Sequence, residues 1–371
     1  MAVPSVDALR AVGQAAGLAA VGVASAERFD DTLVVLRSRK ERGLHGGMHF
    51  TYGRPERSTD PERTMPTARR LVVGALSYRR TPPEEPEAGE ARIAAYQWEP
   101  YYERLRAALG EIASMLVDAG FAAEVLSDDN RLVDRAAAHR AGLGWFGKNT
   151  NLLLPGLGSW FVLGSVLTDA PLEPVAEPVA DGCGPCARCL PACPTGALTA
   201  PGELDARRCL AWLVQADGVF PIEHRAALGD RIYGCDDCQE VCPPNLGRAR
   251  REGPTEPVDR RGAVVDAVEI LELSDVELME RYGAWYIPRR QPAYLRRNAL
   301  VVLGNVGDPT DRRLVDALRR LLGAEPLLAA HAVWTARRLG LDGLLEAVAE
   351  PTDELVAAEL ARPVQPLAAT G

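Results

Sequence analysis

The sequence has neither a long uncharged apolar segment nor a basic N-terminal start followed by an uninterrupted apolar stretch. A membrane-spanning helix needs about 18 or more apolar residues in a row, and a secretory signal needs the basic and apolar start. We therefore expect no membrane partner and a cytoplasmic location. Thiols stay reduced in that compartment, so clustered cysteines there are typical of metal ligands rather than disulfides.

The chain also lacks an overall positive charge. Its 42 Lys and Arg residues are outnumbered by 51 Asp and Glu residues, which gives a formal net charge of -9. This balance argues against nucleic-acid binding that depends on the field of the whole molecule. The local exception is PRRQPAYLRR at 288–297, which holds no acid and four arginines: Arg289, Arg290, Arg296 and Arg297. Screening limits each charge to about 8–10 Å, so this segment can contact phosphates, although a solvated helix face is the alternative.

The composition indicates a folded chain of several domains. Hydrophobic residues make up 47% and charged residues 25%, and 371 residues are too many for one ordinary core. Proline-rich acidic segments at 81–90, 171–181 and 251–257 indicate a surface loop and two domain edges. The sequence therefore predicts three domains and an acidic tail, at residues 1–170, 171–250, 262–350 and 351–371.

Hydrophobic periodicity predicts a different fold class for each end of the chain. Before residue 170, helical and strand-like segments alternate, which predicts an α/β domain with a central sheet. The expected helices lie at 6–17, 29–43, 101–120 and 133–144, and the expected strands at 18–25, 70–78, 121–127 and 159–169. Beyond residue 262 the chain is almost wholly helical, with segments at 263–274, 275–283, 294–307, 311–323, 326–340 and 341–350. These helix pairs resemble HEAT-type repeats, which present an extended surface to a large partner.

The eight cysteines all lie between residues 183 and 242. The first four form the run C-x2-C-x2-C-x3-C-P that is typical of bacterial ferredoxins, in which the fourth cysteine ligates the other cluster. Applying that crossing rule gives two 4Fe-4S clusters with no thiol left over. The first cluster takes Cys183, Cys186, Cys189 and Cys242, and the second takes Cys193, Cys209, Cys235 and Cys238. Two zinc sites are the alternative, but zinc ligands are usually separated C-x2-C pairs, so the spacing favours clusters.

Several motifs around the cysteines carry a family resemblance. They are VDRAAAHRAGLGWFGKNTNLL at 133–153, GSWFVLGSVLTD at 158–169, DARRC at 205–209, IYGCDDCQEVCPPN at 232–245 and LRRNALVVLGN at 295–305. Together they resemble the epoxyqueuosine reductase family, which completes queuosine at the wobble position of tRNA. The resemblance implies an α/β cobalamin-binding domain, a ferredoxin-like two-cluster domain and a HEAT-like helical domain that binds tRNA carrying epoxyqueuosine.

The resemblance also implies a chemistry. An electron donor of unknown identity would reduce the two clusters, the clusters would reduce cobalamin, and the epoxide oxygen would leave as water after uptake of two electrons and two protons. Asp134 matches the family's proton donor, a role that needs a carboxyl kept protonated by burial among apolar neighbours. From the residues alone, an Asp that caps a helix or pairs with Arg131 or Arg135 is the commoner role.

The resemblance further implies cobalamin contacts at Arg57, Tyr96, Asp134, Lys148, Asn149 and Ser159. Gly-rich turns admit close backbone approach to such a large cofactor, and AGLGWFGKN at 141–149 is such a segment. The sequence has no D-x-H-x-x-G run, so no histidine of that motif ligates cobalt. It also departs from the family at Pro100, Tyr101 and Tyr102, where Asp-Tyr-His is frequent.

Three other functions remain as alternatives. They are another corrinoid and iron-sulfur reductase such as a dehalogenase, a non-enzymatic two-cluster electron carrier, and a tRNA-binding scaffold with structural clusters. For the RNA, the four arginines of 288–297 are the expected phosphate contacts. Trp285 and Tyr286 are able to stack on a base, but we expect both rings to pack in the core.

Overall fold

The computed structural model describes residues 2–174, 177–348 and 350–363. The chain divides into two compact units, each assembled from separated segments. The first comprises Met1–Thr81, Ala95–Arg207 and Asp236–Pro257, and the second Pro82–Ala94, Arg208–Cys235 and Val258–Gly371. The cysteine-rich segment contributes to both units, and each unit is described by itself.

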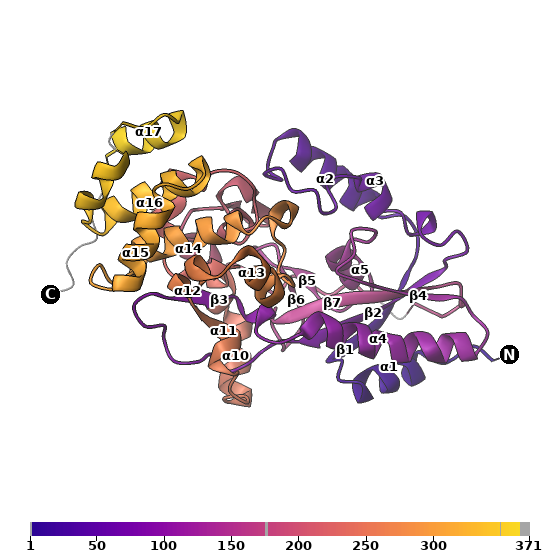
Figure 1. Cartoon of the computed structure of the whole chain (residues 1–371). Coiled ribbons are helices and arrows are strands. Elements are labelled where there is room, and N and C mark those ends of the chain that lie inside the picture. Colours follow the sequence, from indigo (N-terminus) through magenta and orange to yellow (C-terminus); the bar gives the residue numbers. More distant parts are fainter. Residues whose placement is uncertain (1, 175–176, 349, 364–371) are drawn as a thin grey trace. The chain divides into compact units, whose positions relative to one another are not determined.

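A four-stranded antiparallel sheet forms the centre of the first unit, in the order β1-β2-β7-β4 (Figure 1). Its strands are β1 (Ala20–Ser25), β2 (Arg70–Ser77), β7 (Phe161–Thr168) and β4 (Ala123–Ser127). All six inner residues of β2 are buried. A strand buried on both faces reads as a continuous apolar run, and helices must therefore cover both faces of the sheet.

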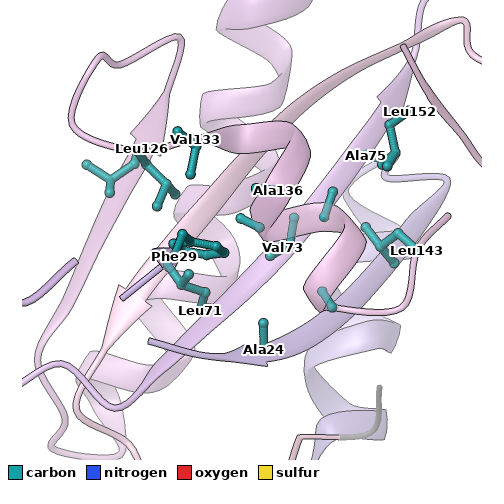
Figure 2. Close-up of a cluster of buried hydrophobic side chains, with 14 of the residues drawn as sticks. Ala24, Phe29, Leu71, Val73, Ala75, Leu126, Val133, Ala136, Leu143 and Leu152 are labelled. Atoms are coloured by element: carbon teal, nitrogen blue, oxygen red, sulfur yellow. The ribbon is translucent and has the colours of Figure 1, made fainter. Parts of the chain in front are cut away.

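Two pairs of helices lie on opposite faces of this sheet (Figure 1). They are α1 (Val6–Ala15) with α4 (Tyr101–Asp118), and α2 (Asp30–Glu41) with α5 (Asp134–Arg140). Alternate residues of β2 join different cores: Val72 packs with the α1 and α4 residues, whereas Leu71 and Val73 pack with those of α2 and α5. Figure 2 shows the second core, with Val133 and Ala136 of the α5 region above the strands. This packing fixes the start of α5, where Asp134 lies.

The cysteine-rich part of the first unit consists of short elements. Where cysteines bind a metal cluster, the ligand bonds stabilise the segment, so little periodic structure is needed there. The remaining helices and strands of the unit are α3 (Pro55–Ser58), β5 (Trp145–Phe146), β6 (Leu152–Leu153), α6 (Cys189–Ala192), β8 (Leu198–Ala200), β9 (Glu203–Leu204), α9 (Asp237–Glu240) and α10 (Pro243–Glu252).

The second unit packs helices around α14 (Ala293–Val306), whose residues Leu300 to Leu303 are fully buried. A small sheet orders β10 (Arg231–Tyr233), β3 (Glu90–Ile93) and β11 (Val264–Asp266). The other helices are α7 (Leu210–Leu213), α8 (Ile222–Leu228), α11 (Arg260–Ala263), α12 (Ala267–Glu272), α13 (Asp275–Tyr282), α15 (Arg312–Leu321), α16 (Pro326–Arg338) and α17 (Glu354–Ala361). Most residues of α14 are buried, Arg297 and Asn298 among them, so this helix lies in the interior of the unit.

The predicted alternation of helices and strands before residue 170 is confirmed, and the fold is a mixed α/β fold with many helices. Two predictions beyond residue 262 are wrong in detail. Residues 264–266 form strand β11, because Asp266 caps α12 by accepting the N–H groups of Val268 and Glu269. Residues Asp342–Val348 form a 3-10 helix rather than an α-helix. In the part of the chain that the structure describes, no helix has the length and apolar character of a membrane span.

Candidate active site and cluster-binding cysteines

Asp134 is the first residue of α5 and has a buried oxygen without a partner. Its Oδ1 atom makes no hydrogen bond to any described residue. Neither of the two nearby arginines forms a close ion pair with Asp134. Arg131 binds Asp129 and Glu124 instead, and Arg135 Nη1 donates to the Thr150 carbonyl at 3.3 Å. This is an unusual state for a buried polar atom, most of which are hydrogen-bonded.

Burial raises the pKa of the Asp134 carboxyl well above its ordinary value. The negative charges of Asp128 and Asp129 raise this pKa further, and the positive charge of Arg135 opposes them. Desolvation disfavours the ionised form of a carboxyl, and nearby carboxylates act in the same direction. The site therefore favours a protonated Asp134 that is able to donate a proton.

Helix α3, which carries Arg57, is joined to the loop before α5. Ser58 of α3 donates a hydrogen bond to the Asn130 carbonyl, which ties α3 to the loop. Burial tends to raise the pKa of Asp129, but hydrogen bonds from Arg131 and the charges of Arg131 and Arg57 lower it overall. Arg57 thus lies within electrostatic reach of the loop that leads into Asp134.

Three other predicted cofactor contacts bind the cysteine-rich segment instead. Lys148 Nζ donates to the Gly184 carbonyl at 2.6 Å. Asn149 is 3% exposed, and its Nδ2 atom donates to the Cys238 carbonyl at 3.3 Å. Ser159 is 4% exposed, and its Oγ atom donates to Gln239 Oε1 at 2.8 Å. The polar atoms of Asn149 and Ser159 are thus buried against the protein and support the cysteine-rich segment, and their contact with cobalamin stays a prediction.

The glycines at 144 and 147 have a packing role that the sequence did not indicate. A Cβ atom at Gly144 would lie 2.0 Å from the Leu153 carbonyl oxygen, and one at Gly147 would lie 2.3 Å from Leu153 Cδ1. The space next to both glycines is thus filled by β6. Their small size serves the β5–β6 hairpin, and their approach to a cofactor stays a prediction.

Sequence reasoning also missed a buried polar network behind the second group of cysteines. Gln239 Nε2 donates to Asp236 Oδ1 at 3.0 Å, and Asp236 Oδ2 accepts the Ala95 N–H at 2.7 Å. Asn245 Oδ1 accepts the Ser159 N–H at 2.7 Å, and its Nδ2 donates to the Gln239 carbonyl at 2.8 Å. The signal was present in CDDCQEVCPPN, where polar residues are interleaved with ligands. The Ala95 bond also anchors the 3-10 turn Ala95–Gln97, which carries the half-buried Tyr96.

Four of the cysteines share one neighbourhood in the first unit. Burial, followed by the negative charges of Cys183, Cys189 and Cys186, raises the pKa of Cys242 to about 11. Cys183 and Cys242 also belong to an apolar cluster with Trp145. The structure thus brings together the four thiols that the crossing rule assigns to one cluster, although Cys242 is distant from the others in sequence.

The other four cysteines come from both units. Cys193 and Cys238 belong to the first unit, and Cys209 and Cys235 to the second. Cys193 Sγ accepts the Ala197 N–H at 3.2 Å; burial alone would raise the pKa of Cys193, but this bond and those from Thr195 lower it. No disulfide joins any of the eight cysteines, all of which the structure describes. Among the described residues, no three His, Cys, Asp or Glu side chains are grouped as ligands of a single metal ion.

The predicted phosphate contacts separate into exposed and buried arginines. Arg289 and Arg290 are exposed, and Arg289 pairs with Asp217 at 2.6 Å. Arg296 pairs with Asp275 at 2.5 Å, with 14% of its side chain exposed. Arg297 is 1% exposed, so its prediction as a phosphate contact is corrected: it lies in the interior and cannot reach an RNA backbone.

The two aromatic residues of this segment also differ. Trp285 is buried and stacks on Tyr233 with ring centroids 4.5 Å apart, as expected for a core residue. Tyr286 is 54% exposed, so the expectation that it packs in the core is wrong. The second unit therefore presents an exposed aromatic ring close in sequence to two exposed arginines.

A family model described as a 4Fe-4S double cluster binding domain matches residues 182–245. This range contains all eight cysteines, and the match supports two 4Fe-4S clusters. The epoxyqueuosine reductase of Bacillus cereus is 33% identical over 95% of this chain and 94% of its own length. That of Vibrio cholerae is 35% identical over 81% of this chain and 82% of its own.

Solved structures of the same enzyme have the same fold. An epoxyqueuosine reductase crystallised with an epoxyqueuosine-modified tRNA-Tyr stem loop aligns with a TM-score of 0.83, at 30% identity over 95% of this chain and 96% of that one. The Bacillus subtilis enzyme, in a structure with its aspartate-bearing catalytic loop swung out of the active site, aligns with a TM-score of 0.82, at 29% identity and the same coverage. Sequence, cluster domain and fold agree: the chain belongs to the epoxyqueuosine reductase family and is an oxidoreductase.

Proposed function

We propose that this chain reduces epoxyqueuosine to queuosine at the wobble position of tRNA, with Asp134 as the proton donor and cobalamin as the cofactor that acts on the epoxide. The observation that carries the proposal is the buried, unpartnered Oδ1 atom of Asp134 at the start of α5. A relative whose fold is shared has a catalytic loop that bears an aspartate. The substrate follows from the relative that binds an epoxyqueuosine-modified stem loop.

The proton requirement explains why a protonated carboxyl is needed. Removing the epoxide oxygen as water consumes two electrons and two protons, and an alkoxide or hydroxide leaves poorly unless it is protonated. Burial and the neighbouring carboxylates raise the pKa of Asp134 well above its ordinary value. The raised pKa favours a protonated Asp134, which would donate its proton towards the substrate oxygen, since Oδ1 has no hydrogen-bond partner among the described residues.

The residues predicted to bind cobalamin fit a corrinoid in part. A buried carboxyl oxygen without a protein partner leaves a polar atom free for an added group. Arg57 and Lys148 supply positive charge for a phosphate or for amide oxygens, and Tyr96 supplies a half-buried ring. These three residues and Asp134 form the proposed cofactor set. When bound, cobalamin supplies a cobalt centre whose reduced form is a strong nucleophile.

The two clusters supply electrons one at a time from an external donor of unknown identity. We propose the crossed assignment, with Cys183, Cys186, Cys189 and Cys242 on one cluster and Cys193, Cys209, Cys235 and Cys238 on the other. The grouping of Cys242 with the first three cysteines supports the first set. We keep residues 1–170, 171–250 and 262–350 as the proposed functional parts for cofactor, clusters and RNA.

The RNA would bind the second unit. Arg289 and Arg290 are exposed cations, and Tyr286 is an exposed ring able to stack on an unpaired base. Arg296 would join them if a phosphate replaced Asp275 as its partner. The helix pairs from α12 to α16 would form the HEAT-like surface predicted from the sequence.

Anaerobically reconstituted protein tests the proposal directly. Protein with full iron content is mixed with cobalamin, a chemical reductant and an epoxyqueuosine-modified stem loop, and nucleosides are identified by mass spectrometry. We expect queuosine to form only when cobalamin is present. Conversion without any corrinoid would remove the cofactor from the proposal but keep the substrate.

A second measurement separates the reductase from a plain electron carrier. Protein purified from cells grown with cobalamin should show corrinoid absorption in addition to the broad cluster bands. Cluster bands alone, together with no conversion of the stem loop, would favour the carrier and contradict the proposed reaction.

A further inference from the structure

Arg297 is buried in the second unit and binds the end of a short helix. Its Nη1 atom donates to the carbonyls of Ala216 at 2.8 Å and Gly218 at 2.7 Å, and its Nη2 atom donates to that of Leu213 at 3.1 Å. Asn298 Oδ1 accepts from Arg297 Nη2 at 2.8 Å. One guanidinium thus binds the carbonyl of the last residue of α7 and two carbonyls of the loop that follows.

The neighbouring Asn298 extends this set of contacts. Its Nδ2 atom donates to the Val214 carbonyl at 2.8 Å. Arg297 also packs against the rings of Phe220 and Tyr294, at 5.7 Å and 5.3 Å from their centroids. Carbonyls at a helix C-terminus have no partner within the helix. Here Arg297 and Asn298 supply donors to the carbonyls at the end of α7 and in the loop that follows.

The helix held in this way begins at Cys209. Cys209 is the N-cap of α7, and its carbonyl accepts the N–H groups of Trp212 and Leu213, both at 2.9 Å. The helix has four residues, and isolated helices of that length are not stable in water. Its position must therefore come from tertiary contacts, and the strongest polar contacts shown are those of Arg297 and Asn298.

Two further buried side chains hold the same loop farther along. His331 Nε2 accepts the Phe220 N–H at 3.2 Å, and Arg225 Nε donates to the Phe220 carbonyl at 3.0 Å. Both side chains are fully buried. The segment after Cys209 is thus fixed at both ends by helices of the second unit.

We propose that Arg297 and Asn298 form a clamp that positions Cys209 as a ligand of the second 4Fe-4S cluster. This inference rests on the proposed ligand assignment. The clamp aligns α7, and α7 begins at the ligand, so loosening the clamp lets the thiolate move away from its iron. Arg297 is a positioning residue, since it contacts backbone carbonyls and no cysteine side chain.

The test compares iron and acid-labile sulfide in Arg297→Met, Asn298→Ala and Cys209→Ala proteins, reconstituted anaerobically as full chains. Two clusters correspond to about eight irons per chain and one cluster to about four. We expect Cys209→Ala and Arg297→Met to fall to about half the wild-type iron, and Asn298→Ala to lie between. Electron paramagnetic resonance of the reduced proteins should show loss of the same cluster signal in all three.

Arg296→Met is the matched control, because Arg296 is adjacent on α14 and pairs with exposed Asp275. It should keep both clusters. Far-UV circular dichroism identifies variants that fail to fold. If Arg297→Met does not fold, Arg297→Lys replaces it, because lysine keeps the charge and some donors. Arg297→Lys should lose part of the same electron paramagnetic resonance signal. Full iron in both folded Arg297 variants would overturn the clamp, as would full iron in Cys209→Ala. Neither result depends on epoxyqueuosine reduction, so failure of the proposed reaction is seen separately.

Discussion

Asp134 in the first unit and Arg297 in the second are both ionisable groups set among apolar residues, yet they differ in their partners. Asp134 has an oxygen that bonds to nothing described, whereas Arg297 donates to three carbonyls and to Asn298. This difference indicates which of the two buried groups is available for chemistry. A buried polar atom without a partner is available to a substrate or cofactor, and one with a full set of partners serves the fold.

The physical reason lies in how each side chain avoids an unpaired buried charge. A carboxyl escapes that cost by keeping its proton, and the pKa of Asp134 is raised accordingly. Burial lowers the pKa of Arg297 to about 10, so the guanidinium stays charged at neutral pH and requires acceptors. Asp134 can therefore remain unpartnered, while Arg297 cannot.

Replacing Asp134 with Asn should give the largest effect, a loss of reaction rate. A positioned acid contributes about 100-fold to 10,000-fold to a rate, and Asn keeps the shape but has no acidic proton. We expect single-turnover conversion of a modified stem loop to slow by about that range. Iron content should stay at the wild-type value, because Asp134 contacts no cysteine. A near wild-type rate with Asn would remove the proton-donor role.

Replacing Arg297 with Met should affect local stability instead. It removes the charged donor that binds the carbonyls of Leu213, Ala216 and Gly218, and a hydrogen bond to a charged group contributes about 1.5–3 kcal/mol. With a loss of about 3 kcal/mol, hydrogen exchange in residues 212–220 should quicken by about 100-fold. Arg296→Met should change exchange there little. Equal protection from hydrogen exchange in the Arg297→Met and Arg296→Met variants would contradict the structural role of Arg297.

The pH dependence of stability should expose the raised pKa of Asp134. From about pH 3.8, the ordinary value for this carboxyl, the unfolded chain releases its proton while the folded chain keeps it. The free energy of unfolding of the wild type, relative to Asp134→Asn, should therefore fall as pH rises, until the folded pKa is reached. Each unit of raised pKa corresponds to about 1.4 kcal/mol. Thermal melts of both proteins across this range measure the difference, and a flat difference would mean an ordinary pKa.

The exposed arginines should give the smallest change, in RNA affinity alone. Replacing Arg289 and Arg290 with Gln removes two proposed phosphate contacts, and each is worth about 0.7–0.9 in the slope of log affinity against log salt. We expect that slope to flatten by about 1.4–1.8 while iron content is unchanged. Arg319→Gln on α15, whose partner is Asp316, is the matched control and should leave the slope unaltered. An unchanged slope in the double variant would place the RNA elsewhere.

The local elements of the first unit could be predicted because their periodicity is strong and their cores are regular. Leu71 and Val73 alternate with Val72 between two cores, as a strand requires. The pattern does not specify the antiparallel pairing of β2 with β1 and β7, since strand direction depends on chain connections. The Cys-Pro spacing likewise indicates clusters, and the crossing rule groups Cys242 with Cys183, but the sequence cannot show the burial that raises the pKa of Cys242 to about 11.

The residues whose burial the sequence did not indicate share one physical cause. Arg297, Asn149 and Ser159 are polar, and polar residues are usually exposed, yet each is buried with its hydrogen bonds satisfied by protein atoms. Each of them has a hydrogen-bond partner that is between 80 and 89 residues away in sequence. Such contacts depend on the tertiary fold, which a motif match does not describe.

The most direct test of the central claim is the nucleoside content of tRNA in a bacterial strain that lacks its own epoxyqueuosine reductase and expresses this chain. With the wild-type chain, mass spectrometry should show that epoxyqueuosine disappears and queuosine returns. With an equal amount of the Asp134→Asn chain, epoxyqueuosine should remain. Persistent epoxyqueuosine in cells that contain the cluster-loaded wild-type chain would contradict the account.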